Sequence, residues 1–235
     1  MDDQHILVLG ATGASGVSFI TAALELSKQP YLTLYVRPGS ESKLPDSANG
    51  RARIRIVEGA LDNAPALKIA LSAADDSSFP AVTMVISFLG AYLSVKATFT
   101  RDQSHPIADA LNSAVLPTMK SCDVSRIMVL NTPTAFCHPS ESKLMPWKWW
   151  FYTLIPLLFA PQGNAEMAGI ASAVASAGAE DDHLGWTIFR VPHLNDRDPN
   201  AKVISGNLDQ GFAGGTELSR GSLARWVLKE MEEGN

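Results

Sequence analysis

The sequence is poor in the residues that mark a metal site, a disulfide framework or a nucleic-acid surface. Its 235 residues include two cysteines, Cys122 and Cys137, which do not form a C-x-x-C pair. So few thiols are typical of a reducing compartment, and we expect a cytoplasmic protein. No Cys/His cluster has the spacing of a metal site. The net charge of −5 argues against nucleic acid as a partner.

A hydrophobic run long enough to cross a membrane is also missing. The most apolar stretch, residues 147–160, is shorter than the ~20 residues that a bilayer requires and contains Lys148 and Pro156. We therefore expect no membrane partner, and we interpret residues 133–164 as a substrate lid or an interface segment. With 46% hydrophobic and 18% charged residues, the composition is that of a folded protein. At this length we expect residues 1–235 to form one domain, as a monomer or a homodimer.

Near the start, a glycine motif stands between a predicted strand and a predicted helix. Gly10-Ala-Thr-Gly13-Ala-Ser-Gly16 follows the apolar run His5–Leu9, with the spacing G-x-x-G-x-x-G. A strand, a glycine turn and a helix together are typical of a dinucleotide site, in which the helix N-terminus binds the phosphates. We expect the cofactor to contact Gly10, Thr12, Gly13, Ala14, Ser15 and Gly16.

Apolar runs alternate with helical stretches along the rest of the chain. This order predicts an α/β fold with a doubly wound parallel sheet of the Rossmann type. The expected strands cover residues 6–9, 32–36, 53–57, 82–89, 126–130 and 186–190. The expected helices cover residues 17–27, 64–74, 107–122, 165–179 and 223–232. Because ligands of such sheets lie beyond the carboxyl ends of the strands, the residues after each strand are candidates for one crevice.

The residue that ends the second strand bears on the choice of cofactor. An acidic residue there would favour NAD, but the sequence has Arg37. An arginine pairs with a 2′-phosphate through its charge and its planar donor fork, so we predict NADP. Ser40 and Lys43 are close enough in the sequence to assist. The alternative interpretation of Arg37 is a solvated surface side chain.

The third and fourth strands end in further candidates for cofactor contact. Leu61 is expected to pack on the adenine ring, and Asp62 to accept a hydrogen bond from its amino group. Asp62 also suits the N-terminus of the following helix as a cap. Phe88, Leu89 and Gly90 are expected to pass under the nicotinamide ribose, because a glycine lets backbone approach the cofactor.

The fifth and sixth strands lead to the nicotinamide end of the expected crevice. Asn131 is expected to contact the cofactor, and Thr132 is a candidate to hydrogen-bond a substrate carbonyl. The same pair also suits an ordinary turn before a proline. After the sixth strand, Val191 and His193 are expected to close over the nicotinamide, with backbone groups facing its carboxamide.

Three side chains, Tyr92, His138 and Lys143, are candidates for proton transfer. Tyr92 and Lys96 match Y-x-x-x-K, a pair in which tyrosine acts as an acid and lysine lowers its pKa. In enzymes that use this pair it follows the fifth strand, whereas here it follows the fourth, so the context favours coincidence. His138 and Lys143 are candidate acids for protonating a reduced product, the alternative being ordinary surface residues.

Together these motifs resemble the atypical short-chain dehydrogenase/reductases with NAD(P)-binding NmrA-like domains, and in particular the small fungal-type members. The resemblance covers nearly the whole chain, through residues 10–16, 35–37, 57–62, 125–132, 185–192 and 218–224. It implies a Rossmann fold with a small C-terminal substrate region, and NADP as cofactor. The serine and the Y-x-x-x-K pair of main-line members are missing from their usual places, so proton transfer by that tyrosine is not expected.

Three functions agree with this resemblance. The first is NADPH-dependent reduction of a bulky apolar ketone, imine or enone, as in the tailoring of secondary metabolites. The second is an isomerisation or cyclisation that the cofactor assists with no net redox change. The third is a non-catalytic NADP sensor. The aromatic stretch of residues 147–159 suits a flat small-molecule substrate, but equally the core or a dimer surface.

Overall fold

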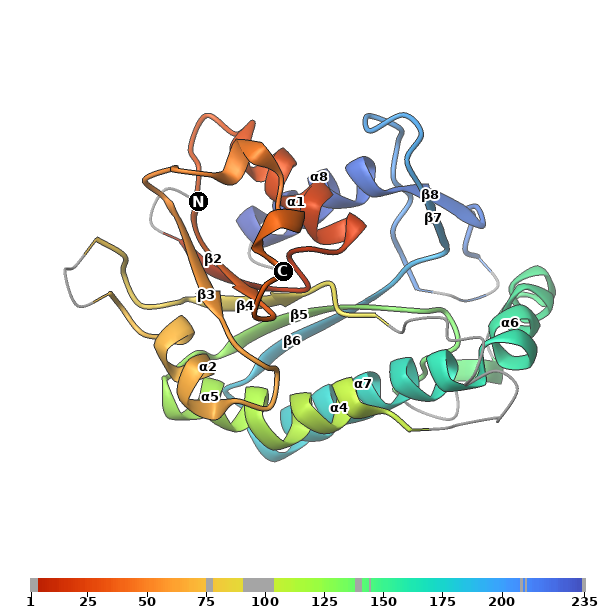
Figure 1. Cartoon of the computed structure of the whole chain (residues 1–235). Coiled ribbons are helices and arrows are strands. Elements are labelled where there is room, and N and C mark those ends of the chain that lie inside the picture. Colours follow the sequence, from red (N-terminus) through yellow and green to blue (C-terminus); the bar gives the residue numbers. More distant parts are fainter. Residues whose placement is uncertain are drawn as a thin grey trace.

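A six-stranded parallel sheet forms the centre of the molecule. The computed structural model describes residues 4–74, 78–90, 104–137, 141–143, 145–207, 209 and 211–233. The strands lie in the order β3-β2-β1-β4-β5-β6 (Figure 1), and every neighbouring pair is parallel. Their bounds are β1 His5–Leu9, β2 Tyr31–Val36, β3 Ile54–Glu58, β4 Met84–Ser87, β5 Arg126–Asn131 and β6 Gly185–Arg190. The order reverses between β1 and β4, the point at which doubly wound sheets bind ligands.

Helices cover both faces of this sheet (Figure 1). One face carries α1 (Ala14–Leu24) and α8 (Arg220–Glu233), which pack against each other. The opposite face carries α2 (Ala64–Leu71), α4 (Pro106–Ala110), α5 (Leu116–Ser121) and α7 (Pro161–Glu180). These three layers confirm the predicted α/β fold of the Rossmann type.

The central strands are buried throughout because helices cover both of their faces. All residues of β1 and β4 are buried. Phe19 and Ile20 of α1 are also fully buried and belong to the same core. Continuous burial of this kind is typical of parallel strands, and it explains why they appear in the sequence as unbroken apolar runs.

The helix predicted over residues 107–122 contains a π-helical segment. α4 continues into η3, a π-helix over Leu111–Val115, and then into α5. Pro117, near the start of α5, has no N–H and would clash with the carbonyl four residues earlier in a regular α-helix. The wider turn just before it avoids that clash. The helix therefore accommodates this proline through a π-helical segment.

Some elements differ from those predicted. α1 begins at Ala14 rather than at residue 17, because Gly13 is its N-cap. β4 is four residues long, shorter than the predicted 82–89. Neither α6 (Trp147–Phe159) nor the parallel pair β7 (His193–Asn195) and β8 (Glu217–Ser219) was predicted. Shorter helical turns are η1 Glu41–Lys43, η2 Asp46–Ala48 and η4 Glu141–Lys143.

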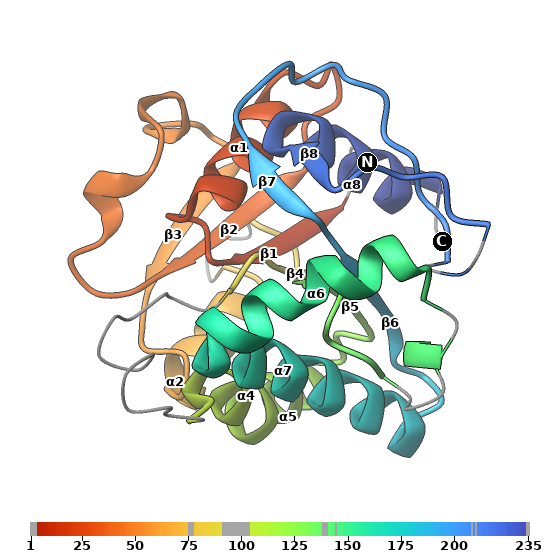
Figure 2. The same ribbon diagram turned by 90° about the vertical axis from the view of Figure 1, so that its right-hand side faces the viewer.

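The unpredicted elements lie at one end of the sheet. Figure 2 views the molecule from this end and shows α6 crossing in front of β5 and β6, with β7 and β8 above it. The pair β7 and β8 leads into α8 and forms the small C-terminal region. Within the described ranges, no helix has the length and apolar character needed to cross a bilayer.

Candidate functional site

The turn after β1 is shaped by two glycines that cannot be replaced without a clash. Gly10 has φ 78°, and a Cβ on it would lie 2.9 Å from the carbonyl carbon of Phe88. A Cβ on Gly16 would lie 2.3 Å from the carbonyl oxygen of Gly10. Gly10 therefore fits the turn against β4, and Gly16 lets α1 pack on the turn. These are the roles that the sequence motif predicts for them.

The N-terminus of α1 has the features of an anion site. Gly13 is the N-cap and offers no side-chain cap, and the first turn of the helix has no acidic residue. A Cβ on Gly13 would meet only the Gly10 carbonyl oxygen at 3.4 Å, an ordinary contact. Packing therefore does not require a glycine here, whereas close approach of a phosphate would. The first N–H groups of the helix, from Ala14 to Gly16, suit a diphosphate.

Arg37 lies exposed at the carboxyl end of β2. A tight turn holds it there: the Ser40 N–H donates to the Arg37 carbonyl at 2.9 Å. The Gly39 N–H donates to a carboxylate oxygen of Glu58 at 2.8 Å, and Gly39 has φ 74°. Lys43 follows in η1 and is exposed. Two cations thus lie close in sequence at the end of the crevice where the sequence predicts the 2′-phosphate.

The end of β3 separates two roles that the sequence left open for Asp62. The N-cap of α2 is Asn63, whose side-chain oxygen accepts from the Ala66 N–H at 3.1 Å. Asp62 is exposed and does not cap the helix. The Tyr35 hydroxyl donates to the Ala60 carbonyl at 2.8 Å. Burial, and to a smaller extent the Asp62 charge, raise the pKa of Tyr35, so Asp62 lies near this phenol.

After β4, the Phe88 side chain is buried and the Leu89 side chain is half-buried. The Phe88 ring lies between those of Phe19 at 5.2 Å and Phe189 at 6.2 Å. The Leu89 N–H donates to the Ser87 hydroxyl at 3.3 Å. A Cβ on Gly90 would meet no described atom within 4 Å, so packing does not require this glycine.

The ends of β5 and β6 are joined by hydrogen bonds. Asn131 is fully buried: its amide N–H donates to the Met167 carbonyl at 2.9 Å, and its side-chain oxygen accepts from the Thr132 N–H at 2.7 Å. The Val191 N–H donates to the Asn131 carbonyl at 2.9 Å. Asn131 thus ties β5 to α7 and fixes the position of Thr132. The half-buried Thr132 hydroxyl is hydrogen-bonded to that of Thr134 at 2.9 Å.

The remaining candidates are scattered or not described. Tyr92 and His138 lie outside the described residues. Lys143 is exposed on η4. His193 begins β7 with an exposed side chain, and its N–H donates to the Thr216 carbonyl at 3.1 Å. Of the four candidate catalytic residues Tyr92, Thr132, His138 and Lys143, Thr132 alone is both described and at the end of a central strand.

A cavity of about 570 Å³ opens beyond the carboxyl ends of β5 and β6. Pro133 and Pro192, which follow these two strands, form part of its wall. Glu141 and Arg190 also line it and form a half-buried ion pair with 2.5 Å between Oε2 and Nη2. The remaining wall is mixed: it has the aromatic residues Phe136, Trp149, Phe189, Phe212 and Trp226, and the charged residues Lys202, Asp209 and Glu217. The wall does not include the glycine motif, so the cavity is a separate space beside the strand ends.

Trp149 connects α6 to this cavity. Its side chain is 3% exposed, and its ring lies 5.8 Å from that of Phe212 and 5.5 Å from that of Tyr152. The sequence predicted a substrate lid or an interface segment in residues 133–164, and it did not single out Phe212. A signal exists: Phe212 stands among glycines, and a Cβ on Gly214 would lie 2.3 Å from its ring.

Two titratable groups near this cavity are held in their neutral forms. Burial raises the pKa of the Cys137 thiol, and Glu141 raises it further, while Arg190 acts in the opposite sense. A protonated thiol is a poor nucleophile. Burial also raises the pKa of the Tyr152 phenol, with a smaller contribution from Glu217 and an opposing hydrogen bond to the His193 backbone. Neither group therefore brings a charge to the cavity region.

Sequence comparison agrees with this geometry. A family model described as NAD(P)H-binding matches residues 10–233, nearly the whole chain. The chain belongs to this NAD(P)H-binding family. Among curated proteins, no relative matches its sequence.

Solved structures of other proteins show the same fold. A wide-type short-chain dehydrogenase/reductase from Veillonella parvula, in complex with NADP, is 18% identical with a TM-score of 0.64, covering 99% of this chain and 88% of that one. The oxidoreductase ylbE from Lactococcus lactis is 16% identical with a TM-score of 0.59, covering 97% and 85%. The UDP-Glc/GlcNAc 4-epimerase from Campylobacter jejuni is 12% identical with a TM-score of 0.61, covering 96% and 73%.

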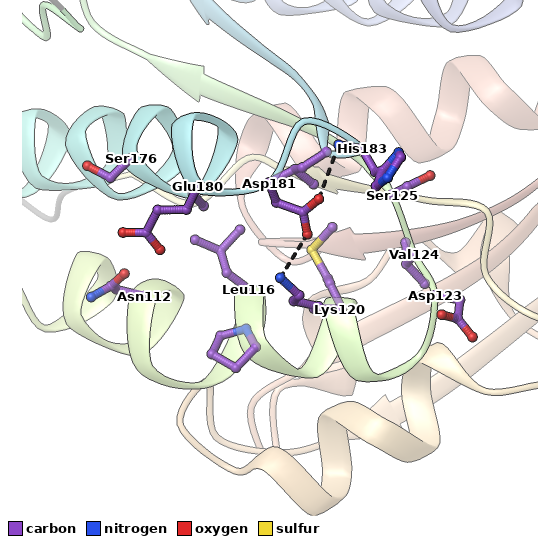
Figure 3. Close-up of a pocket in the computed structure, with 14 residues that line it drawn as sticks. Asn112, Leu116, Lys120, Asp123, Val124, Ser125, Ser176, Glu180, Asp181 and His183 are labelled. Atoms are coloured by element: carbon purple, nitrogen blue, oxygen red, sulfur yellow. Dashed lines mark hydrogen bonds and ion pairs between the residues drawn. The ribbon is translucent and has the colours of Figure 1, made fainter.

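This NAD(P)H-binding protein has a second cavity, of about 600 Å³, at the amino ends of β5 and β6. Figure 3 shows it between the end of α7 and the segment η3–α5, next to the starts of β5 and β6. An ion pair between Lys120 and Asp181, 3.0 Å long, and the His183 N–H lower the pKa of Asp181. The amino ends of parallel strands are not where doubly wound sheets bind cofactors. This cavity is therefore not part of the cofactor site.

Proposed function

We propose that this NAD(P)H-binding protein is an NADPH-dependent reductase of a bulky, apolar ketone, imine or enone, an atypical short-chain reductase of the NmrA-like type. We further propose that it works in the cytoplasm, in the tailoring of secondary metabolites. The observation that carries the proposal is the cavity beside the ends of β5 and β6, whose wall includes aromatic residues. Its volume of about 570 Å³ lies in the range of small-molecule sites, and its aromatic residues suit a flat apolar ring system.

Residues at the strand ends support the proposed cofactor at its diphosphate and adenosine parts. The N-terminus of α1 is suited to the diphosphate, and Arg37 to a 2′-phosphate. Asp62, which does not cap α2, retains its carboxylate for the adenine amino group, with Leu61 beside it. When bound, the reduced nicotinamide supplies a hydride. The protein supplies position: holding donor and acceptor together and excluding water accounts for much of the catalysis of such reactions.

Thr132 is the proposed positioning group for the substrate. Thr132 follows β5; its backbone N–H donates to the Asn131 side chain, and its hydroxyl is hydrogen-bonded to that of Thr134. A hydroxyl held in this way can donate to a carbonyl oxygen and orient it. Lys143, His138 and Tyr92 are the remaining candidates for delivery of the proton. Cys137 is not a candidate nucleophile, because its thiol is kept protonated.

Turnover tests the proposal directly. The protein is mixed with NADPH and a panel of polycyclic ketones, imines and enones, and the absorbance of the reduced nicotinamide is followed while products are analysed by mass spectrometry. Consumption of NADPH with formation of reduced product is the expected result. Product without net oxidation would replace the proposal with an isomerase or cyclase. Cofactor binding with no product from any member would favour an NADP-sensing regulator.

The choice of NADP is tested separately with Arg37→Asp. Charge-assisted hydrogen bonds contribute about 1.5–3 kcal/mol each, so affinity for NADPH is expected to fall roughly 10- to 100-fold. Affinity for NADH, which has no 2′-phosphate, is expected to change little. Titration calorimetry with both cofactors measures the difference. Equal loss of affinity for NADPH and NADH would contradict the assignment of Arg37 as the 2′-phosphate partner.

A further inference from the structure

The helix α6 carries aromatic side chains on two faces. Among the described residues, one face packs against the rest of the molecule and the other is exposed to solvent. Trp149 points inward, with 3% of its side chain exposed, and packs on Phe212. Trp147, Trp150 and Phe151 are 74%, 51% and 59% exposed. These three residues stand at positions i, i+3 and i+4, which lie on one side of a helix. Together they form an outward aromatic stripe, defined here as residues 147, 150 and 151.

The rings of this stripe contact one another. The Trp147 and Phe151 rings have centroids 6.1 Å apart, and the Trp150 and Phe151 rings 5.1 Å apart, both edge to face. The three side chains therefore form one continuous apolar surface. The stripe is not part of the cavity wall, to which α6 contributes Trp149. Figure 1 shows α6 at the outer end of the molecule.

Along the sequence, the charged residues next to the stripe are positive. Residues 142–165 contain Lys143 and Lys148 and no aspartate or glutamate, whereas the whole chain has a net charge of −5. Both lysines are exposed. The nearest acidic residue before them, Glu141, is paired with Arg190. The stripe thus lies in a segment whose charged residues are exposed lysines, in a chain that is acidic as a whole.

The exposed rings and the nearby lysines together indicate what kind of partner can bind the stripe. A symmetric contact between two copies requires a self-complementary patch, but here lysines would face lysines. Three exposed rings also provide a few hundred Å² at most, well short of the about 1,600 Å² of a standard stable interface. A surface that is apolar and negatively charged fits both features. Tryptophan at the headgroup level and lysine near anionic lipids are the usual means by which a helix lies on a membrane.

We propose that α6 docks this protein on an anionic lipid surface through the aromatic stripe, with Lys143 and Lys148 toward the headgroups. The helix would lie in the interface and not cross it. This differs from the expectation of no membrane partner, which was based on the length needed to span a bilayer. Because Trp149 on the inner side of α6 lines the cavity, docking would place that cavity beside a lipid phase that dissolves apolar substrates. Only this last step rests on the proposed reductase function.

Vesicle flotation tests docking without any need for turnover. The full chain is mixed with phosphatidylcholine vesicles, with or without phosphatidylserine, at low and high salt. We expect flotation with the serine lipid, and at least a several-fold loss with phosphatidylcholine alone or with added salt. The combined variant Trp147→Ser, Trp150→Ser and Phe151→Ser is expected to remain unbound. Ile69→Ser on α2, an equally exposed apolar residue at 64%, is the matched control and should float like wild type.

Clear results would overturn the proposal. Wild-type protein that stays with the soluble fraction at every lipid composition would do so. Equal flotation of the triple variant would also do so, since the stripe would not be the contact. If the stripe instead binds a second copy, analytical ultracentrifugation will show a dimer that the triple variant loses, with no vesicle binding. Failure of turnover with normal flotation would contradict only the reductase function.

Discussion

The glycine turn on the cofactor side and the cavity beside β5 and β6 are built by different means. On the cofactor side, the glycine turn is shaped by missing side chains: Cβ atoms on Gly10 and Gly16 would collide with neighbouring backbone. On the substrate side, the cavity is built from large side chains brought together from distant segments, such as Trp149 of α6 and Phe212. The glycine turn is specified by local spacing and the cavity by tertiary contacts. This difference decides what a mutation in each region will do.

The largest expected effect comes from Gly16→Ala. The added methyl would lie 2.3 Å from the Gly10 carbonyl oxygen, and backbone cannot move away as a flexible side chain can. We expect a loss of about 3 kcal/mol in unfolding free energy and no measurable NADPH binding. Urea denaturation and titration calorimetry measure the two quantities. Gly13→Ala is the control, expected to fold normally but to bind NADPH weakly, because its methyl meets only ordinary contacts. Normal NADPH binding by Gly16→Ala would contradict the predicted clash with the Gly10 carbonyl oxygen.

The next effect, on the substrate side, separates the two faces of α6. Trp149→Ala removes a buried ring from contacts with Phe212 and Tyr152, and we expect a loss of about 3 kcal/mol in stability together with a weaker substrate affinity. Trp147→Ala, two residues earlier and 74% exposed, should leave stability within about 0.5 kcal/mol of wild type. Thermal and urea unfolding compare the pair. Similar losses for both variants would mean that α6 does not pack as described.

This contrast explains how much the sequence could predict. Strand ends, the glycine turn and Arg37 are encoded by neighbours in the chain, so the Rossmann fold and the cofactor-side residues were within reach of pattern reasoning. Asn63 illustrates a limit even there, since Asp62 and Asn63 are both good caps and only the geometry of the helix start selects between them. The pairing of Trp149 with Phe212 joins residues 63 positions apart, and no local period encodes it.

A smaller effect is expected at the other end of β1, opposite the glycine turn. His5 is buried, its Nδ1–H donates to the Pro80 carbonyl at 2.5 Å, and its Nε2 accepts from the Thr33 hydroxyl at 2.7 Å. Burial and, to a smaller extent, the Arg55 charge lower its pKa from 6.5 to about 4, against the Pro80 hydrogen bond. Between about pH 4 and 6.5, His5 is therefore protonated in the unfolded chain and neutral in the folded chain. Stability should be complete above about pH 6.5 and fall as the pH drops toward 4.

Urea unfolding across this pH range measures the loss. One pKa unit corresponds to about 1.4 kcal/mol, so with partial solvent screening we expect roughly 2 kcal/mol in all. His5→Gln should be less stable near neutral pH, because it does not reproduce both ring hydrogen bonds, but it should lose this part of the pH dependence. A pH profile of the same slope in wild type and His5→Gln would assign the acid sensitivity to other groups.

The smallest effects divide capping from cofactor contact at the end of β3. Asn63→Ala removes the bond to the Ala66 N–H and should cost about 1 kcal/mol of stability, while NADPH affinity stays unchanged. Asp62→Ala removes an exposed carboxylate that caps nothing, so stability should stay unchanged. If Asp62 accepts a hydrogen bond from adenine, NADPH affinity falls several-fold, in line with about 1 kcal/mol for one hydrogen bond. Calorimetry and urea unfolding on both variants give four values. The opposite pattern would make Asp62 structural and leave the adenine end of the site to backbone and apolar packing alone.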